Sequence, residues 1–266
     1  MKKIAVCGKG GVGKSFIVYL LANLFIKKGY SVLVVDSDES NMTLHKLFGF
    51  PETPKSFMDY LGGRRSIQQR MMRRFQTQGG ESKMKVIEKD SIRSEDIPDE
   101  YIKRKDGLSL ISVGKIKEPL EGCACPMGVI SRELLEVVEQ KDDGVVLVDT
   151  EAGLEHFGRG IESGIDTVIV VSEPYVDSIK LAQKALELSK EMGKEAYLIV
   201  NKVPVEFENK VRETIRNKGM EISGIIHFSP EVYSSSIDGK IPDNAKVAKE
   251  VEEILNKIWK SSPSNP

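Results

Sequence analysis

The chain has 266 residues, of which 30% are charged and 40% hydrophobic, and this length suits one well-buried α/β domain or two small ones. A formal net charge of −1 gives no global argument for binding nucleic acid or an anionic membrane, so any basic contact would have to be local. There is no long apolar segment, and three cysteines make no disulfide framework, so we expect a cytoplasmic protein without a signal peptide or membrane span.

A glycine-rich loop follows the first predicted strand. The apolar run Ile4–Cys7 precedes it and a helical pattern from Phe16 to Lys28 follows it, which is the context of a phosphate-binding loop. Backbone N–H groups can turn toward phosphate oxygens there, Lys14 can reach the β- and γ-phosphates, and the Ser15 hydroxyl can bind Mg²⁺. The alternative is a glycine-rich turn without a ligand. The residues predicted to bind nucleotide are Gly8, Lys9, Gly10, Gly11, Val12, Gly13, Lys14, Ser15 and Phe16.

Two aspartates follow the second predicted strand. Ser31–Val35 is a short β-branched run, typical of a strand buried on both faces, and it leads into Asp36 and Asp38. Ligands bind at this carboxyl edge in open α/β sheets. One carboxylate can support the Mg²⁺ shell and the other can orient or deprotonate the attacking water. The alternative is a pair of solvated turn aspartates.

Periodicity fades from about residue 51 to residue 107. Five arginines lie between Arg64 and Arg74, with no acidic residue from Arg64 to Phe75. We expect an inserted, partly mobile surface region with some helix, inside a single domain that spans residues 1–266. The arginines are a candidate contact for an acidic partner or nucleic acid, but a solvated helix face explains them better, so nucleic acid is not an expected partner.

Two cysteines lie between the next two predicted strands. Leu108–Gly114 is expected to be a strand, and Cys123 and Cys125 stand just before a helix predicted from about Val129 to Gln140. Thiols two residues apart in an extended segment point to the same side, and a nearby helix N-terminus favours the thiolate. Two copies related by a twofold axis would supply four sulfurs, enough for tetrahedral Zn²⁺ or square-planar Ni²⁺. Packed free thiols are the alternative.

Val145–Asp149 is predicted to be a buried strand of the Walker B type. Its terminal acid, Asp149, would hold the magnesium shell through water, and Gly153 would lie near the γ-phosphate.

The remaining chain continues the alternation of strands and helices. We expect strands at residues 166–172, 196–200 and 224–228, and amphipathic helices at 176–192 and 244–260. The last helix carries acids opposite its apolar stripe, which is unlike the basic face of a membrane-surface helix, so no membrane partner is expected. The predicted fold is α/β, with a mainly parallel sheet of about seven strands and helices on both faces.

The loop resembles the deviant Walker A motif of the MinD/ParA ATPases and the nitrogenase iron protein, because Lys9 adds a second lysine before Gly10 and Gly11. The resemblance implies ATP and Mg²⁺ as cofactors and an ATP-dependent homodimer in which Lys9 reaches the partner's nucleotide. It also implies that Asp38 activates the attacking water. For the nucleotide base, it implies that Asn201 bonds adenine and that Lys202 packs on the ring. It further implies that Pro230 lies in a second base-contacting loop. The alternative for residues 201–202 is a plain turn at the end of a strand.

The run from Asp149 to Gly160, together with Cys123 and Cys125, resembles the CooC type of this superfamily. This resemblance implies an ATP-hydrolysing metallochaperone that inserts nickel into carbon monoxide dehydrogenase, with nickel or zinc at the two cysteines. His156 is a possible further ligand, although a packing role fits it better. Two other functions stay open: a ParA/MinD-like positioning or DNA-associated ATPase, and an iron–sulfur redox partner.

Overall fold

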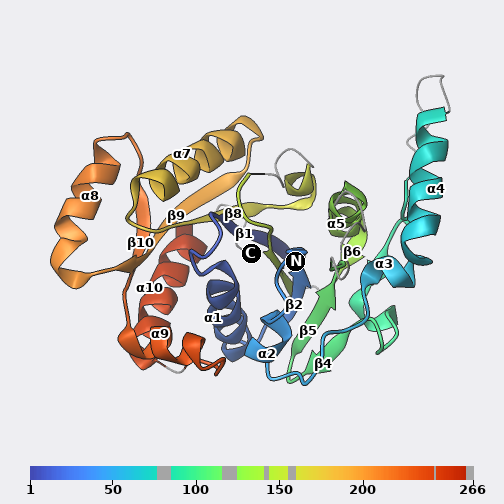
Figure 1. Cartoon of the computed structure of the whole chain (residues 1–266), viewed down its shortest axis with the longest axis horizontal. Helices are drawn as coiled ribbons and strands as arrows, with labels where there is room; N and C mark the ends of the chain where they lie inside the picture. Colours follow the sequence, from blue (N-terminus) through green and yellow to red (C-terminus); the bar gives the residue numbers. More distant parts are fainter. Residues whose placement is uncertain (77–84, 116–124, 141–143, 155–159, 243, 262–266) are drawn as a thin grey trace.

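The computed structural model describes residues 1–76, 85–115, 125–140, 144–154, 160–242 and 244–261. Eight strands form one sheet in the order β10-β9-β8-β1-β7-β2-β5-β4 (Figure 1). All neighbours in this sheet pair in parallel except β4 and β5. The strands are β1 (Lys2–Gly8), β2 (Ser31–Asp36), β4 (Lys103–Lys105), β5 (Leu108–Ser112), β7 (Gly144–Asp149), β8 (Thr167–Ser172), β9 (Glu195–Val203) and β10 (Ile222–His227).

Helices cover both faces of this sheet, as the sequence predicts. Side chains alternate between the faces: Ile4 and Val6 of β1 join one buried apolar cluster, and Ala5 and Cys7 join the other. The first cluster is completed by α1 (Lys14–Lys27), α2 (Leu44–Leu47) and α10 (Ala245–Ser261). The second is completed by α3 (Phe57–Tyr60), α4 (Gly63–Gln76), α5 (Cys125–Val137), α7 (Val176–Glu191) and α8 (Glu208–Arg216).

Seven of the eight strands are those predicted. The eighth, β4, has the sequence Lys-Arg-Lys and pairs antiparallel with β5 at the edge of the sheet. Three charged residues carry no apolar alternation, so their pattern does not indicate a strand. Helix α5 also begins at Cys125, earlier than the predicted Val129, because the apolar periodicity starts only after its first turn.

Within residues 51–107, the described part contributes to the core. Phe57, Ile67, Ile92 and Ile102 are almost fully buried in the same cluster as α5 and α7. A two-stranded parallel sheet of β3 (Ile92–Arg93) and β6 (Val138–Glu139) links this segment to the end of α5. That the segment is an insert stays a prediction.

The arginine-rich stretch forms α4, and the Arg70 side chain is engaged in the fold. Arg70 donates hydrogen bonds from its guanidinium to the carbonyl oxygens of Val86 (2.8 Å) and Leu61 (3.1 Å). It therefore ties α4 to the two backbone segments beside it, which is a structural role. The side chains of Arg73 and Arg74 lie outside the described residues.

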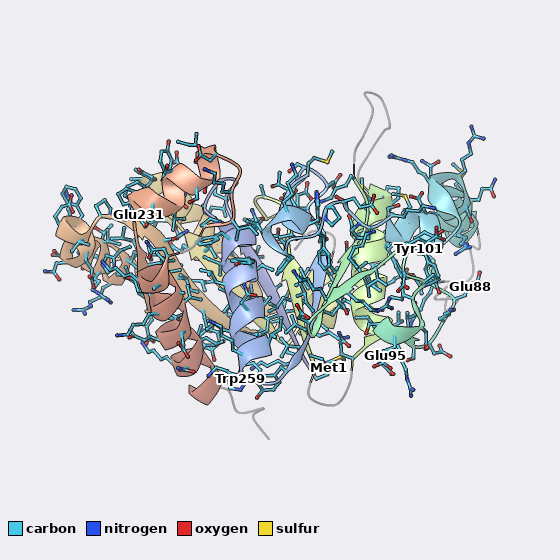
Figure 2. All side chains as sticks on the ribbon, turned by 90° about the horizontal axis from the view of Figure 1, so that it is seen from below. Met1, Glu88, Glu95, Tyr101, Glu231 and Trp259 are labelled. Carbon is cyan, nitrogen blue, oxygen red and sulfur yellow. The ribbon has the colours of Figure 1, made fainter. Side chains whose placement is uncertain are left out.

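Helix α10 packs along α1 with an aromatic cluster near its end. The Trp259 ring lies 4.9 Å from the Phe25 ring and 5.8 Å from the Tyr30 ring, centroid to centroid. Figure 2 shows Trp259 on the same edge of the molecule as Met1, with Glu231 on the opposite edge. Glu231 lies in α9 (Pro230–Ile237). None of the helices within the described ranges is both long and apolar enough to cross a membrane.

The end of β10 is held by a histidine between two carboxylates. Nδ1 of His227 lies 2.8 Å from Glu250 Oε1 on α10, and Nε2 lies 3.0 Å from Glu208 Oε2 on α8. Burial lowers the pKa of His227, but its hydrogen bonds to Glu250 and Glu208 outweigh burial and raise the pKa above the ordinary value of 6.5. The ring thus joins elements from both faces of the sheet.

Replacing this histidine should weaken the fold in a pH-dependent way. A raised pKa stabilises the folded state fully below the unfolded pKa, and the contribution is lost as the pH rises through the folded pKa. We therefore expect His227→Gln to lower the free energy of unfolding by roughly 1–2 kcal/mol at about pH 6 and by much less at about pH 9. Urea denaturation of both proteins across this range measures the difference, and an equal loss at both ends would contradict the assignment.

Candidate functional site

The phosphate loop joins β1 to α1, and its shape requires glycine at two positions. Gly8 has φ 147° and Gly13 has φ 97°. A Cβ at Gly8 would lie 2.1 Å from the Val171 carbonyl oxygen, and a Cβ at Gly13 would lie 2.6 Å from Asn201 Nδ2. The loop therefore packs directly on β8 and β9, and α1 presents its free N–H groups to the space above.

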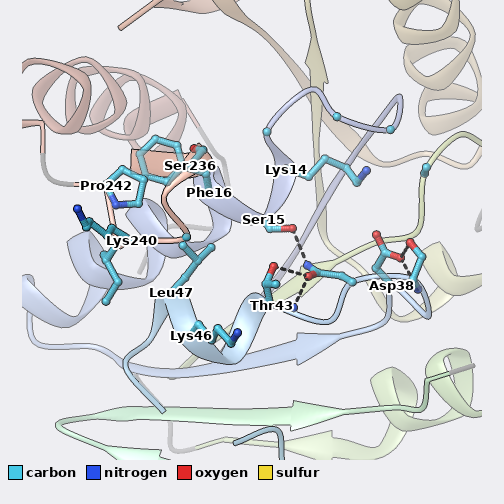
Figure 3. Close-up of a pocket in the computed structure, with 18 residues that line it drawn as sticks. Lys14, Ser15, Phe16, Asp38, Thr43, Lys46, Leu47, Ser236, Lys240 and Pro242 are labelled. Carbon is cyan, nitrogen blue, oxygen red and sulfur yellow. Dashed lines mark hydrogen bonds between the residues drawn. The ribbon is translucent and has the colours of Figure 1, made fainter. Parts of the chain in front are cut away.

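A cavity of about 460 Å³ lies over this loop. Figure 3 shows Lys14, Ser15 and Asp38 on its wall, with Phe16, Lys240 and Pro242 across from Asp38. The buried Lys14 side chain bends back so that Nζ donates to the Gly8 carbonyl oxygen at 3.4 Å. The structure thus brings the loop, the lysine and one of the two predicted aspartates to one polar cavity.

The predicted magnesium ligands meet in one hydrogen-bonded cluster. The Ser15 hydroxyl donates to Asp149 Oδ2 at 2.6 Å, and Asn41 Nδ2 donates to Ser15 Oγ at 2.9 Å and to Asp149 Oδ2 at 3.2 Å. Within the described part of the chain, the buried Oδ1 of Asp149 has no hydrogen-bond partner. Burial raises the pKa of Asp149 to about 6, against the lowering effect of Ser15 and Lys14. A buried carboxylate with a free oxygen beside a serine hydroxyl fits a hydrated Mg²⁺.

Asp38 lies in the turn after β2, and its carboxylate is held by hydrogen bonds from Ser40. Its Oδ1 accepts hydrogen bonds from the Ser40 backbone N–H (2.9 Å) and the Ser40 hydroxyl (2.6 Å). Asp38 is almost buried, yet it lines the phosphate cavity. Its placement fits the predicted role of orienting water, which stays a prediction.

Asp36 is placed behind the cavity rather than on its wall. Its Oδ2 lies 2.7 Å from Lys115 Nζ, and both side chains are buried. Burial raises the pKa of Asp36 to about 7, although Lys115 lowers it. Its direct partner is therefore a lysine, and support for the Mg²⁺ shell from Asp36 stays a prediction.

Gly153 connects the end of β7 to the phosphate loop. Its N–H donates to the Gly8 carbonyl oxygen at 3.1 Å, and its φ is 89°. The neighbouring Ala152 lines the cavity. The segment after β7, in which Gly153 is predicted to lie near the γ-phosphate, is therefore in contact with the loop that would hold the phosphates.

A second cavity of about 280 Å³ adjoins the loop at the ends of β9 and β10. Asn201 Nδ2 donates to the Val12 carbonyl oxygen (2.8 Å), and Lys202 Nζ donates to the Gly11 carbonyl oxygen (2.6 Å) and to Glu173 Oε1 (2.7 Å). Both predicted base-contacting residues line this cavity. They also support the phosphate loop, which the sequence did not indicate.

The second predicted base loop begins at the N-terminus of α9. Pro230 is the first residue of α9, and the residues that line the cavity there are its neighbours Ser229 and Val232, together with Phe228 and Tyr233. The Ser229 hydroxyl caps α9 by accepting from the Val232 N–H at 3.2 Å. An aromatic-walled cavity beside a phosphate loop has the form of a nucleotide base site.

Lys9 is exposed at the tip of the loop, where it can reach outward. Of the predicted metal ligands, Cys123 and His156 lie outside the described residues, and Cys125 is the first residue of α5, so metal binding there stays a prediction. Among the described residues, no group of three or more His, Cys, Asp or Glu side chains could hold a metal ion.

Sequence reasoning missed several residues of the site, and those whose side chains make polar contacts with its motifs include Ser40, Asn41, Lys115 and Glu173. Each is a single polar residue outside the motif that it supports. A polar residue in a short turn after a predicted strand is the only signal that could have found Ser40 and Asn41.

The chain is similar to nucleotide-binding proteins over most of its length. A family model described as the CobQ/CobB/MinD/ParA nucleotide binding domain matches residues 3–243. An uncharacterized ATP-binding protein of Methanocaldococcus jannaschii is 43% identical over 257 residues, which cover 96% of this chain and 100% of that protein. The carbon monoxide dehydrogenase accessory protein CooC of Rhodospirillum rubrum is 32% identical over 191 residues, covering 72% of this chain and 70% of that protein.

The fold is also similar to solved structures. The MinD cell division protein of Aquifex aeolicus matches with a TM-score of 0.65 and 20% identity, covering 100% of both chains. The MinD protein of Pyrococcus horikoshii, solved with Mg-ADP, matches with a TM-score of 0.65 and 14% identity over 97% of this chain and 96% of that one. Both likenesses concern the α/β fold. The family model, which matches residues 3–243, shows that the chain belongs to the CobQ/CobB/MinD/ParA family of nucleotide-binding proteins.

Proposed function

We propose that the protein is an ATP-hydrolysing, nucleotide-switched homodimer that acts as a metallochaperone and delivers nickel to carbon monoxide dehydrogenase. The observation that carries the proposal is the 32% identity to the CooC accessory protein over 72% of the chain. The Cys-x-Cys pair at Cys123 and Cys125 gives the chemistry, because each copy supplies two thiolates and two copies supply four. Nickel or zinc is the cargo of this site.

Nucleotide binding rests on the loop. Its glycines and the N-terminus of α1 direct N–H groups at phosphate oxygens, and Lys14 lies buried beside them, where its charge acts with little solvent screening. Mg²⁺ held by Ser15, and by Asp149 through water, would neutralise charge that develops on the phosphates. The base would fit against Asn201, Phe228 and Tyr233 in the adjoining cavity.

Hydrolysis is assigned to Asp38. Its carboxylate is an acceptor, and the two hydrogen bonds from Ser40 fix its orientation on the cavity wall. A carboxylate held in this way can accept a hydrogen bond from an attacking water and so orient it. Most of the rate enhancement would come from positioning and from the charges of Lys14 and Lys9.

The dimer is supported by an apolar surface at the carboxyl edge of the sheet. Large side chains that are 44% to 71% exposed follow successive strands there: Tyr175 after β8, Phe207 after β9, and Phe228, Tyr233 and Ile237 after β10. Lys9 is exposed at the same edge, after β1. A second copy that covers this edge would bury the apolar side chains and bring its own Lys9 to the facing nucleotide.

Replacing Asp38 tests the hydrolytic step. We expect Asp38→Asn to lower kcat for ATP hydrolysis by roughly 100-fold, because the amide is a poor acceptor for the water proton. ADP affinity, measured by calorimetry, should stay within about threefold, because the loop contacts are unchanged. A variant that hydrolyses ATP at the parent rate would contradict the role of Asp38.

Replacing Lys9 tests the dimer. The parent should be a dimer with MgATP and a monomer with ADP, and Lys9→Ala should lose the ATP-dependent dimer and roughly 100-fold in ATPase rate. Sedimentation and ATPase assays measure both. Lys27→Ala, at the far end of α1, is the matched control for an exposed lysine and should behave as the parent. A Lys9→Ala protein with the parent's dimer and rate would rule out this use of Lys9.

Anaerobic calorimetry with Ni²⁺ and Zn²⁺ tests the cargo site. We expect one tightly bound ion per dimer, altered in affinity by MgATP and abolished in Cys123→Ser/Cys125→Ser. Cys7→Ala is the control, because Cys7 is buried in β1. If the parent binds neither metal with any nucleotide, the metallochaperone role is wrong and a MinD/ParA-like positioning ATPase becomes the better assignment. A brown colour after anaerobic purification would point instead to an iron–sulfur cluster.

A further inference from the structure

Lys115 is a buried lysine to which the sequence assigned no role. It follows β5 by three residues, and only 6% of its side chain is exposed. Its Nζ makes two contacts with the turn after β2: Asp36 Oδ2 at 2.7 Å and the Asp38 carbonyl oxygen at 2.5 Å. Burying an ammonium group is costly unless it is paired and hydrogen-bonded, so these two acceptors fix where the lysine can lie.

The first contact joins Lys115 to a rigid part of the sheet. Asp36 ends β2, which pairs in parallel with both β5 and β7. The Val113 N–H donates to the Asp36 carbonyl oxygen at 3.0 Å, and the Ser37 N–H donates to the Asp149 carbonyl oxygen at 3.0 Å. Backbone pairing on both sides therefore fixes Asp36, and its carboxylate holds the lysine head in one position.

The second contact reaches the part of the turn that leaves the sheet. The Asp38 carbonyl oxygen accepts from Lys115 Nζ and also from the Asn41 N–H at 3.3 Å. Lys115 thus holds the peptide group that follows Asp38. The Asp38 carboxylate on the same residue faces the phosphate cavity.

We propose that Lys115 is a positioning residue for ATP hydrolysis. Lys115 is anchored by Asp36 and holds the Asp38 backbone in place, and this fixes the position of the Asp38 carboxylate relative to the phosphate loop. The inference rests on the proposed ATPase function. Lys115 does not line the phosphate cavity, so it acts through Asp38 and not on the nucleotide. A small displacement of a group that orients the attacking water lowers the reaction rate by a large factor. A buried side chain that holds this peptide group in place should therefore affect kcat.

The test compares ATP hydrolysis and ADP binding in Lys115→Met and Lys115→Arg. We expect Lys115→Met to lower kcat by roughly 10- to 100-fold while the affinity for ADP changes less than about threefold. Lys115→Arg keeps a cationic donor and should recover part of the rate. Lys103→Met is the matched control, because Lys103 on the neighbouring β4 pairs with Glu52 at 2.7 Å and lies outside the site; it should keep the parent kcat.

A second pair of variants covers the case in which Lys115→Met fails to fold because Asp36 is left buried without a partner. Asp36→Asn alone keeps an amide oxygen that accepts from Lys115, so the lysine stays anchored as a donor to the Asp38 carbonyl oxygen. Asp36→Asn/Lys115→Met removes this donor without leaving a buried charge. The double variant should have a kcat at least about tenfold below that of Asp36→Asn at similar thermal stability. Equal kcat values in this pair, or the parent's kcat in a folded Lys115→Met, would overturn the proposal. A parent that hydrolyses no ATP would instead refute the proposed function.

Discussion

The site depends on how the charge of one buried carboxylate, that of Asp149, is compensated. The residue is fully buried at the end of β7, and burial raises its pKa to about 6. Ser15 from α1 and Asn41 from the turn after β2 both donate to the same oxygen, Oδ2. Two segments far apart in the sequence are therefore held together by a shared acceptor, and the remaining oxygen, Oδ1, has no partner among the described residues. A divalent cation with its water shell would satisfy it and complete the cluster.

The parallel sheet makes this convergence possible. β1, β7 and β2 are adjacent and run in one direction, so the phosphate loop, Asp149 and the Asp36–Asp38 turn all follow the carboxyl ends of neighbouring strands. Register makes the placement specific, because Val6 pairs with Asp149 and Asp149 pairs with Asp36. A shift of one residue in either pairing would turn these side chains to the other face. The buried apolar runs that fix the register are thus also what assembles the polar site.

Those apolar runs explain why most of the fold could be predicted from the sequence. Seven strands are short stretches with an apolar core, most of them rich in β-branched residues, whereas a charged edge strand such as β4 carries no such signal. The phosphate loop, Asp149 and Asp38 could be placed because each lies at the end of a recognisable strand or within two residues after it. Asn41 and Lys115 could not be placed from the sequence. Asn41 reaches the site because of the path of the turn after β2, and Lys115 reaches it through a contact between segments that are distant in the sequence; neither feature leaves a local sequence pattern.

The turn after β2 forms hydrogen bonds both to α1, beside the phosphate cavity, and to α5. The Ser37 hydroxyl lies 2.7 Å from the Ser131 hydroxyl of α5, and both are buried. On the other side, Asn41 reaches Ser15 at the start of α1. Displacement of this turn must therefore either break a buried hydrogen bond to α5 or carry α5 with it, since an unpaired hydroxyl in the core is costly. The turn that carries Asp38 and the helix that begins at Cys125 are therefore joined through one buried hydroxyl pair, which fixes how they sit relative to each other.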